Sequence, residues 1–231
     1  KRPNVVAVFE RLAKIFDGSY CIAFVNAYGE MVIARDPLGF RPLVYAIKDG
    51  NLFAASESNA LINLGLHDFK PLDPGQLIHV DEHGKITFHQ FAKSQRKAHC
   101  MFEWVYFSHV GSVIDNHSVY IARKNLGTEL AALETEKITD DCIVVAVPDT
   151  AKAASDAYAF KLGIPPVEGL IRNRFVGRTF IEGSDREGKV LNKYTVLKEV
   201  LHGKRVFLVD DSIVRGTTIK QIVKILKEIG G

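Results

Sequence analysis

The sequence lacks any long hydrophobic run and contains few cysteines. Its longest purely apolar stretches, such as Cys142–Val147, fall far short of the roughly 20 residues that a membrane-spanning helix needs. The three cysteines, Cys21, Cys100 and Cys142, are far apart and show no paired metal-ligand spacing. We therefore expect no membrane span, and a cytoplasmic protein with reduced thiols. Cys21 and Cys142 fall in apolar, strand-like runs, which predicts that both thiols are buried.

The chain also lacks a strong charge of either sign. It carries 30 Lys and Arg against 27 Asp and Glu, a formal net charge of +3 over 231 residues. This balance is too small to indicate a nucleic-acid-binding surface, and we expect no nucleic-acid partner. The 47% apolar and 25% charged residues are typical of a folded globular protein and exclude a mainly disordered chain. The length suits one large or two modest domains.

The two ends of the sequence lie inside or directly after predicted helices. The chain begins at Lys1 and soon enters residues 5–12, which have the pattern of a helix interior. It ends at Gly231, just after another predicted helix. We therefore expect the chain to be a piece of a longer protein at both ends.

Three pairs of predicted strands follow one another in the first part of the chain. Each pair is joined by a short turn that contains glycine, and the pairs are 19–25 with 31–34, 44–47 with 52–55, and 76–80 with 85–91. Successive hairpins predict a largely antiparallel sheet, accompanied by a short helix over residues 58–64. A polar, basic stretch at 92–98 predicts the domain boundary, which gives domains 1–95 and 96–231.

The second part of the chain alternates between helices and strands. The patterns predict strands at 141–147 and 206–209 and helices at 118–134, 151–162, 194–201 and 218–229. This alternation is typical of a parallel α/β sheet. The predicted fold class is therefore α/β overall, with an antiparallel α+β domain followed by a parallel α/β domain.

The strongest functional pattern lies at residues 206–218. Four apolar residues predict a buried strand, and Asp210 and Asp211 follow where it ends. Ligands bind at the carboxyl ends of strands in open α/β sheets. Two carboxylates suit ribose hydroxyls or a divalent cation, and the start of the next helix suits a phosphate group. A phosphorylated sugar has both requirements, although an Asp-Asp pair can also simply cap a helix.

Residues 206–218 closely resemble the phosphoribosylpyrophosphate (PRPP) loop of the type I phosphoribosyltransferases. This resemblance implies that Asp210 and Asp211 bind the ribose and Mg²⁺. It also implies a cradle for the 5′-phosphate that consists of Ser212, Arg215, Gly216, Thr217 and Thr218.

A second strand-to-helix junction lies at residues 143–152. The helix that begins there can hold an anion at its N-terminus, and Lys152 adds positive charge. The junction resembles the pyrophosphate loop of the same family, which implies PRPP binding by Asp149, Thr150 and Lys152. Members of that family usually carry a hydroxyl residue at the position of Ala151, so the sequence puts a metal ligand at that position in question.

Residues 172–193 carry six basic and three acidic side chains. Because this segment lies between two predicted phosphate-binding junctions, we expect a mobile basic lid over a polyanion rather than a merely solvated loop. The stretch 173–181 resembles the flexible loop of the glutamine PRPP amidotransferases. This resemblance implies that Arg174 and Arg178 take part in phosphoribosyl transfer.

Two segments of the first part, 35–43 and 56–58, resemble the N-terminal-nucleophile glutaminase domain that several amidotransferases share. The prolines and glycine of 35–43 predict a tight connection between strands, and we expect ion pairs of Arg35 or Arg41 with Asp36 or Glu57. The nucleophilic cysteine of such a domain would lie upstream of Lys1. None of the three cysteines is therefore expected to be the nucleophile, and the chain alone is expected to lack glutamine-dependent activity.

Together the resemblances cover nearly all 231 residues and indicate the amidophosphoribosyltransferase family. They imply the C-terminal part of an αββα class II glutaminase domain over 1–95, and a type I phosphoribosyltransferase domain over 96–231 that lacks its C-terminal end. The implied enzyme uses PRPP, glutamine and Mg²⁺ in the first step of de novo purine biosynthesis and is a homo-oligomer, a tetramer by family resemblance. The alternatives are another type I phosphoribosyltransferase and a PRPP-binding regulator.

Two features leave questions open. Cys100 lies where some members place one ligand of a [4Fe–4S] cluster, but members without the cluster also carry cysteine there. Both interpretations of Cys100 therefore stay open. Residues 108–112 depart from the usual sequence of the family, and the sequence alone offers no reason for the difference.

Overall fold

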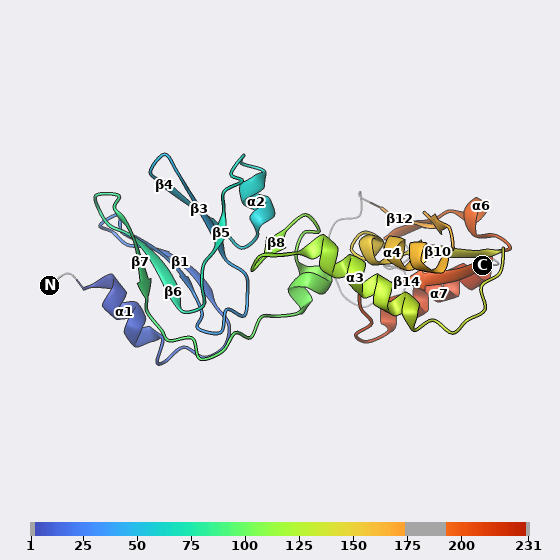
Figure 1. Ribbon diagram of the computed structural model, residues 1–231, viewed down its shortest axis with the longest axis horizontal. Coiled ribbons are helices and arrows are strands. Elements are labelled where there is room, and N and C mark those ends of the chain that lie inside the picture. The colour runs from blue at the N-terminus through green and yellow to red at the C-terminus, as the bar shows by residue number, and fades with distance from the viewer. Residues whose placement is uncertain (1–2, 174–192, 230–231) are drawn as a thin grey trace. The chain divides into compact units, whose positions relative to one another are not determined.

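The computed structural model describes residues 3–173 and 193–229 (Figure 1). Arg174 and Arg178, predicted as lid residues, lie outside the described residues. The chain divides into two compact units, residues 1–119 and 120–231, and each unit is described by itself. Residues 96–119, which the sequence patterns grouped with the second domain, are part of the first compact unit.

The described part of the first unit contains two antiparallel sheets of three or more strands and one short hairpin. The larger sheet has the order β1-β2-β6-β7, and its strands are Cys21–Val25, Met31–Arg35, Gln76–Val80 and Ile86–Gln90. The smaller sheet has the order β4-β3-β5, with strands Asn51–Ala55, Val44–Lys48 and Lys70–Pro71. The three predicted hairpins are confirmed as β1–β2, β3–β4 and β6–β7. They are divided between two sheets instead of forming one.

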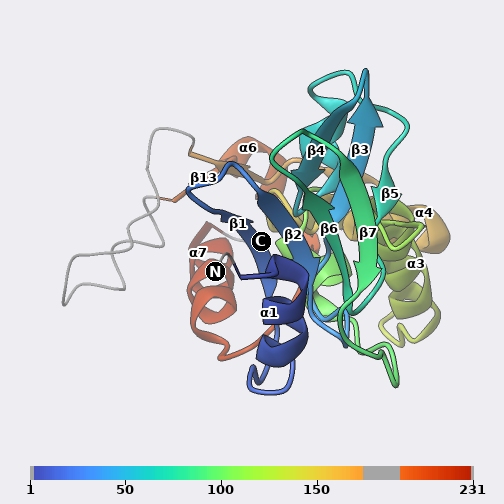
Figure 2. The same cartoon turned by 90° about the vertical axis from the view of Figure 1, so that its left-hand side faces the viewer.

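Two helices cover these sheets. Helix α1 (Val5–Leu12) packs on the larger sheet (Figure 2), and the Asn4 side chain caps it by accepting the Ala7 N–H at 3.0 Å. The shared core is apolar and comprises Val5, Phe9, Val32, Ala34, Leu77 and Phe91. Helix α2 (Ser58–Ile62) packs on the smaller sheet through Leu61, which is buried with Val44 and Ala46.

The segment after β7 completes the first unit. It contains a π-helical turn, η1 (Glu103–Phe107), which the sequence patterns did not predict. A short hairpin of β8 (Val113–Ile114) and β9 (His117–Ser118) follows. The two residues of its turn, Asp115 and Asn116, have φ angles of 45° and 68°, a conformation that short polar side chains tolerate better than most.

The second unit is built on a parallel sheet of order β11-β10-β14. Its strands are Pro166–Val167, Cys142–Ala146 and Arg205–Val209. Strand β10 pairs with β14 along its whole length, from Cys142 opposite Arg205 to Ala146 opposite Val209. The helices among its described residues are α3 (Val119–Ala132), α4 (Lys152–Leu162), α6 (Lys198–Leu201) and α7 (Thr217–Ile229). The predicted α/β fold class is confirmed.

Strand β10 separates two hydrophobic cores in this unit. Side chains of a strand alternate between the two faces of the sheet. Cys142 and Val144 therefore pack with residues of α3 and α4, whereas Ile143 and Val145 pack with residues of α6 and α7. The sheet is thus covered by helices on both faces, which matches the continuous apolar sequence of its strands.

Two short strands, one before and one after residues 174–192 in the sequence, pair to form an antiparallel ribbon. It pairs β12 (Leu170–Arg172) with β13 (Tyr194–Val196), and the Asn173 N–H donates to the Lys193 carbonyl at 2.9 Å. The predicted helix over 194–201 is wrong in its first part, because α6 begins only at Lys198. Thr195 and Val196 are β-branched and favour the extended conformation that this pairing requires.

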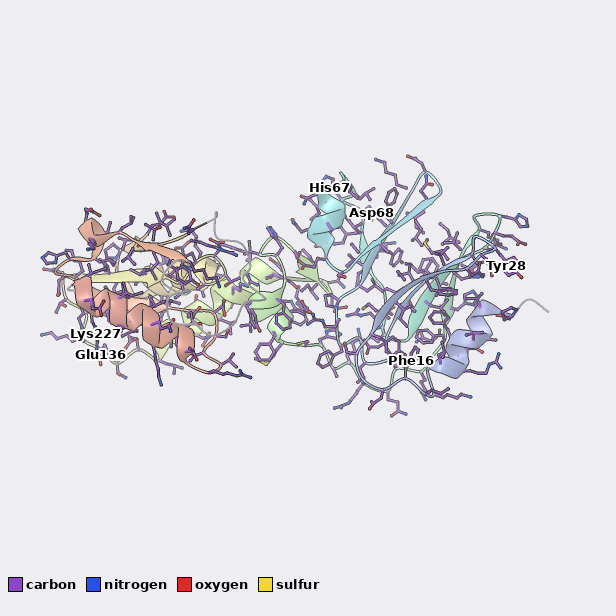
Figure 3. All side chains as sticks on the ribbon, turned by 180° about the vertical axis from the view of Figure 1, so that it is seen from behind. Phe16, Tyr28, His67, Asp68, Glu136 and Lys227 are labelled. Carbon is purple, nitrogen blue, oxygen red and sulfur yellow. The ribbon has the colours of Figure 1, made fainter. Side chains whose placement is uncertain are left out.

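The surface includes one exception to the predicted burial of cysteine. Cys100 and Cys142 are buried, but Cys21 is exposed, because β1 is an edge strand of its sheet. Large aromatic side chains such as Phe16 and Tyr28 are also exposed (Figure 3). Across residues 3–173 and 193–229, no helix has the length and apolar character needed to cross a membrane.

Candidate functional site

Two loops leave the carboxyl edge of the parallel sheet from neighbouring strands. The first loop, residues 147–151, follows β10, and the second loop, residues 210–216, follows β14. The Val147 N–H donates to the Val209 carbonyl at 2.8 Å. This bond continues the ladder beyond the end of β10 and fixes how far apart the two loops begin.

The two loops are joined through Asp211. The Thr150 hydroxyl of the first loop donates to Oδ2 of Asp211, and the Ser212 hydroxyl donates to Oδ1 at 2.5 Å. Asp210 accepts the backbone N–H of Asp211 on its Oδ1 at 2.8 Å. Burial raises the pKa of Asp210; the hydrogen bond from the Asp211 N–H opposes this shift, and the negative charge of Asp211 adds to it. The pair therefore forms a half-buried, negatively charged centre at the sheet edge.

The second loop ends in the first turn of α7. Gly216 has a φ of +70°, and its carbonyl accepts the Lys220 N–H at 3.1 Å, so Gly216 occupies the capping position. Arg215, Thr217 and Thr218 are exposed at this point. The first N–H groups of a helix have no partner within the helix, so this turn offers donors and a partial positive charge to an anion.

The first loop carries charges that pair outside the acidic centre. Its Pro148–Asp149 peptide bond is cis, and the Asp149 carboxylate lies 3.0 Å from Nη1 of Arg172 on β12. The Lys152 ammonium lies 4.0 Å from Asp156 and 3.9 Å from Glu168. Asp149, Lys152 and Arg172 all line a cavity of about 270 Å³. The structure thus places Asp149 and Lys152 at this cavity, while Thr150 reaches Asp211.

Ala151, where the sequence raised the question of a missing hydroxyl, is fully buried. Its carbonyl accepts the Ser155 N–H at 2.9 Å in the first turn of α4. In this loop the hydroxyl that reaches the acidic centre is that of Thr150.

Tyr194 is a candidate residue that the sequence patterns did not identify. It lies on β13 directly opposite Arg172 and packs against the core beside α6 and α7. Burial raises the pKa of its hydroxyl, and the carboxylates of Asp210, Asp211 and Asp149 raise it further against the opposing charge of Arg172. Nothing in the local sequence marks this tyrosine, because only the pairing of β12 with β13 brings it near the acidic loops.

The acidic pair fits a cation that arrives with a phosphorylated substrate. Mg²⁺ prefers oxygen ligands and is commonly held by one or two carboxylates together with substrate phosphates. Asp210 and Asp211 supply such carboxylates. The described part of the chain contains no group of three or more His, Cys, Asp or Glu residues that could hold a metal on its own. Cys100 is buried, and both interpretations of it from the sequence, cluster ligand and plain buried thiol, stand as they were.

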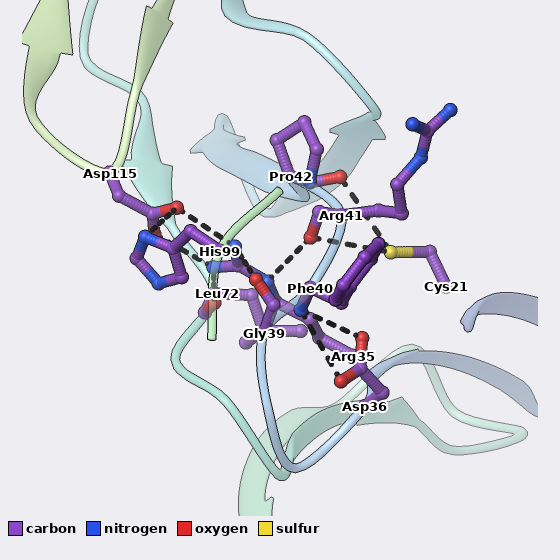
Figure 4. A network of polar contacts seen from close by, with 10 residues as sticks. All are labelled: Cys21, Arg35, Asp36, Gly39, Phe40, Arg41, Pro42, Leu72, His99 and Asp115. Carbon is purple, nitrogen blue, oxygen red and sulfur yellow. Dashed lines mark hydrogen bonds and ion pairs between the residues drawn. The ribbon is translucent and has the colours of Figure 1, made fainter. Parts of the chain in front are cut away.

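A second polar network lies in the first unit around Arg35 (Figure 4). The Arg35 guanidinium binds both carboxylate oxygens of Asp115 at 2.8 Å each. It also donates to the carbonyls of Leu72, Gly39 and Arg41 at 2.8, 3.0 and 2.9 Å. The predicted partners of Arg35 were Asp36 and Glu57, and this prediction is wrong because the β8–β9 turn delivers Asp115 to the buried guanidinium.

The remaining charges of the two glutaminase-like segments organise the chain locally. The Asp36 Oδ1 accepts the Leu38 N–H at 2.9 Å and caps the turn, in which Gly39 has a φ of +60°. Arg41 pairs with Glu103 at 2.8 Å, which is not one of its predicted partners.

Glu57 has a role in holding the segment at 108–112. It accepts the His109 N–H at 2.7 Å and the Ser112 hydroxyl at 2.8 Å. Together with the turn at Asp36, these contacts give the glutaminase-like segments and residues 108–112 structural roles.

The first unit matches the family model of the glutamine amidotransferase domain over residues 4–63. The chain is 40% identical over 225 residues to the amidophosphoribosyltransferase of Pyrococcus horikoshii, a match that covers 96% of this chain and 48% of that protein. It is 42% identical over 230 residues to the enzyme of the same name from Archaeoglobus fulgidus, covering 98% and 49%. The Escherichia coli amidophosphoribosyltransferase is 38% identical over 238 residues, covering 98% and 47%.

A solved structure is also similar. The glutamine PRPP amidotransferase from B. subtilis, complexed with ADP and GMP, matches all of this chain and 50% of its own, with a TM-score of 0.88 and 36% identity. The predicted resemblance to amidophosphoribosyltransferases is therefore confirmed over nearly the whole chain. The chain spans about half the length of the curated relatives it matches.

Proposed function

We propose that this protein is a glutamine-dependent amidophosphoribosyltransferase. It converts PRPP and glutamine-derived ammonia to 5-phosphoribosylamine and pyrophosphate, the first step of de novo purine (IMP) biosynthesis. The observation that carries the proposal is the pair of loops joined from Thr150 to Asp211 at the edge of a parallel sheet. The match of residues 4–63 to a glutamine amidotransferase domain and the relatives of that name support it.

The second loop binds the sugar phosphate in this proposal. Asp210 and Asp211 accept hydrogen bonds from the ribose hydroxyls, since ionised carboxylates are strong acceptors. The 5′-phosphate binds the free N–H groups at the start of α7, together with the hydroxyls of Thr217 and Thr218. Ser212, which the sequence also assigned to this cradle, donates its hydroxyl to Asp211. Arg215 is exposed on the same loop and contributes positive charge. One loop thereby recognises both polar ends of the ribose.

The first loop faces the leaving group. Ammonia attacks the anomeric carbon of PRPP, the bond from that carbon to pyrophosphate breaks, and the negative charge on pyrophosphate increases. The start of α4 and the side chain of Lys152 stabilise this charge. Mg²⁺, when bound with the substrate, neutralises part of the pyrophosphate charge. Asp210 and Asp211 are the residues that would hold it.

The chemistry places modest demands on proton transfer. Ammonia attacks as a neutral amine, so the protein does not need a strong general base at the anomeric carbon. The ammonia comes from glutamine hydrolysis in the glutaminase domain and reaches PRPP through an internal channel. Excluding water during this transfer prevents hydrolysis of PRPP, and the predicted lid residues Arg174 and Arg178 are assigned to that role.

The two alternative functions explain less of the chain. A type I phosphoribosyltransferase that acts on a nucleobase would share the second loop but has no use for the glutaminase-like first unit. A PRPP-binding regulator would likewise leave the match over residues 4–63 without a purpose. The use of Mg²⁺, a homo-oligomeric state and a cytoplasmic location remain predictions from the sequence.

Substitution of the acidic pair tests the proposal. In the full-length protein, Asp210→Asn and Asp211→Asn should each abolish most product formation from PRPP with ammonium as the nitrogen source. Glutamine hydrolysis should stay chemically possible in both variants, because the substitutions lie in the other unit. Unchanged ammonia-dependent formation of phosphoribosylamine in both variants would refute the assigned roles.

A further inference from the structure

Tyr194 presents a hydroxyl group that no other described residue engages. It lies on β13, is half-buried, and its ring packs against the core beside α6 and α7. Buried tyrosine hydroxyls usually find a hydrogen-bond partner. Within residues 3–173 and 193–229, however, the Tyr194 hydroxyl has none. The apolar part of this side chain is therefore in the core, and its one polar group remains available to a ligand.

The strand pairing places Tyr194 beside the first loop. It is directly opposite Arg172 across β12 and β13, and residues opposite each other in an antiparallel pair have neighbouring side chains on one face. Arg172 in turn lies 3.0 Å from the Asp149 carboxylate of the first loop. The negative charges of Asp149 and of the acidic pair all act on the Tyr194 hydroxyl. Because charge interactions weaken with distance, this hydroxyl lies near both loops.

We propose that Tyr194 is a further catalytic residue, which donates its O–H to the pyrophosphate group of PRPP as that group leaves. This rests on the proposed function, because it takes PRPP as the substrate held by the two loops. When the bond from the anomeric carbon to pyrophosphate breaks, its electron pair stays on the pyrophosphate oxygen. The phenol stabilises the increased negative charge through a hydrogen bond and keeps its own proton. The leaving group is its target because the neighbouring first loop faces pyrophosphate.

An uncharged donor suits a position that faces both carboxylates and phosphate. The ordinary pKa of a phenol is about 10, so it is protonated at neutral pH and adds no negative charge to the site. A hydroxyl also forms a shorter and stronger hydrogen bond with an ionised oxygen than with a neutral one. A cation in this place is paired by the nearby carboxylates, as Arg172 is by Asp149. The neutral hydroxyl of Tyr194 stays free for the substrate.

The ribbon holds Tyr194 in a fixed place. Backbone hydrogen bonds lie on both sides of it, because the Asn173 N–H donates to the Lys193 carbonyl at 2.9 Å and the Leu197 N–H donates to the Gly169 carbonyl at 3.0 Å. A tyrosine side chain has only two torsions, so ordering it costs little entropy. A donor on paired strands, with its ring locked by packing, is positioned more accurately than one on an unpaired loop.

The test is Tyr194→Phe in the full-length protein, which removes the hydroxyl and keeps the ring that packs on the core. With ammonium as the nitrogen source, kcat should fall about tenfold or more, the usual effect of losing a hydrogen bond to a charged group. The KM for PRPP and the Tm should stay the same, because the bond strengthens only as the leaving group gains charge. An unchanged kcat, or a loss confined to KM, would overturn the proposal.

Tyr158→Phe is the matched control. Its ring is also packed in a core of the second unit, but its hydroxyl donates to Glu134, just after α3. This variant should have a lower Tm, because a hydrogen bond within the protein is lost. Its kcat should equal that of the unmodified protein. An equal fall of kcat in both variants would show a general effect of removing a phenol hydroxyl and would overturn the proposal.

A spectroscopic measurement tests the contact without catalysis. In full-length protein labelled with fluorotyrosine, the fluorine resonance that disappears in Tyr194→Phe belongs to Tyr194. Addition of inorganic pyrophosphate with Mg²⁺ should shift this resonance and leave the resonance of Tyr158 in place. The absence of a shift at pyrophosphate concentrations that inhibit product formation would overturn the proposal.

Asp210→Asn separates the role of Tyr194 from the proposed function. If the unmodified protein forms no phosphoribosylamine from PRPP and ammonium, the proposed function fails and the role of Tyr194 fails with it. If Asp210→Asn abolishes product formation while Tyr194→Phe leaves it unchanged, the proposed function stands and only the role of Tyr194 fails. We expect both variants to be impaired.

Discussion

Arg35 and Asp115 lie 80 residues apart in the sequence and form a buried, bidentate ion pair. The side chains are 1% and 12% exposed, and each oxygen of the carboxylate accepts one N–H of the guanidinium at 2.8 Å. The pair fastens the β8–β9 turn to the end of β2. Because the guanidinium has three further carbonyl partners, removal of the carboxylate would leave a buried charge only partly compensated.

Asp115→Asn should lower the free energy of unfolding of the first unit by about 3–5 kcal/mol, the usual cost of removing one partner of a buried ion pair. Denaturation in urea, followed by circular dichroism, measures this loss. Asp68→Asn is a suitable control because Asp68 is exposed in the same unit (Figure 3), and it should leave the transition unchanged. Equal stability of the two variants would contradict the role of the ion pair.

The same pair should make stability depend on pH in the acid range. Burial alone raises the pKa of Asp115, but the hydrogen bonds and charge of Arg35 outweigh it and hold this pKa below its ordinary value. A carboxyl with a lowered pKa stabilises the folded state above its ordinary pKa of about 3.9, and this contribution disappears as pH falls through the lowered value. The difference in stability between the unmodified protein and Asp115→Asn should therefore be constant near neutral pH and shrink toward pH 3, about the acid end of the titration. A difference that grows on acidification would contradict this assignment.

Cys21 should react slowly with alkylating reagents although the residue is exposed. Although part of the residue is open to solvent, its sulfur lies 3.6 Å from the Pro42 carbonyl. The protein atoms around the sulfur remove water from it, and this burial of the thiol group raises the pKa of Cys21 to about 11. Thiolates are the reactive form, so iodoacetamide labelling near pH 7.5 should be far slower than that of a free cysteine, whose pKa is about 8.5. The labelling rate at this site should keep rising up to about pH 11. Mass spectrometry of the Cys21 peptide measures the rate, and a plateau near pH 9 would rule out the raised pKa.

Gly127→Ala should destabilise the second unit. A methyl group at Gly127 on α3 would come within 2.0 Å of the Ala154 carbonyl oxygen on α4, so the two helices would have to separate. Overpacking of this kind typically costs about 1–3 kcal/mol, although alanine is intrinsically the better helix former. Asn125→Ala on the exposed face of the same helix is the control and should be neutral or slightly stabilising. Thermal unfolding measures the Tm of both variants, and a Tm for Gly127→Ala as high as that for Asn125→Ala would contradict the predicted clash.

The sequence predicted those parts of the fold that depend on local patterns. The hairpins, α1, α7 and the strands β10 and β14 follow directly from turn residues and hydrophobic periodicity. The short strands β11, β12 and β13 did not, because each forms through pairing with a distant or neighbouring strand and only weakly through its own composition. Tyr194 illustrates this point, since its strand was predicted to be helical.

The candidate site was predictable where one segment carries the chemistry. Asp210, Asp211 and the start of α7 are contiguous, so their sequence alone suggests an acidic centre beside an anion-binding helix turn. The contacts between segments were not predictable. The bond from Thr150 to Asp211 cannot be predicted from local sequence, and neither can the pairing of Arg35 with Asp115. Each depends on how the strands bring separate loops together.

The division of β10 between two cores has a consequence for heat inactivation. Alternate residues of this one strand belong to opposite interiors, so loosening of either interior disturbs the same backbone. Thr150 and Asp211 are attached to that strand and to its paired neighbour, a few residues from where the pairing ends. Thermal unfolding of the second unit and loss of the arrangement of Asp210 and Asp211 should therefore be one cooperative transition. No partly unfolded intermediate should keep one of the two loops in place without the other.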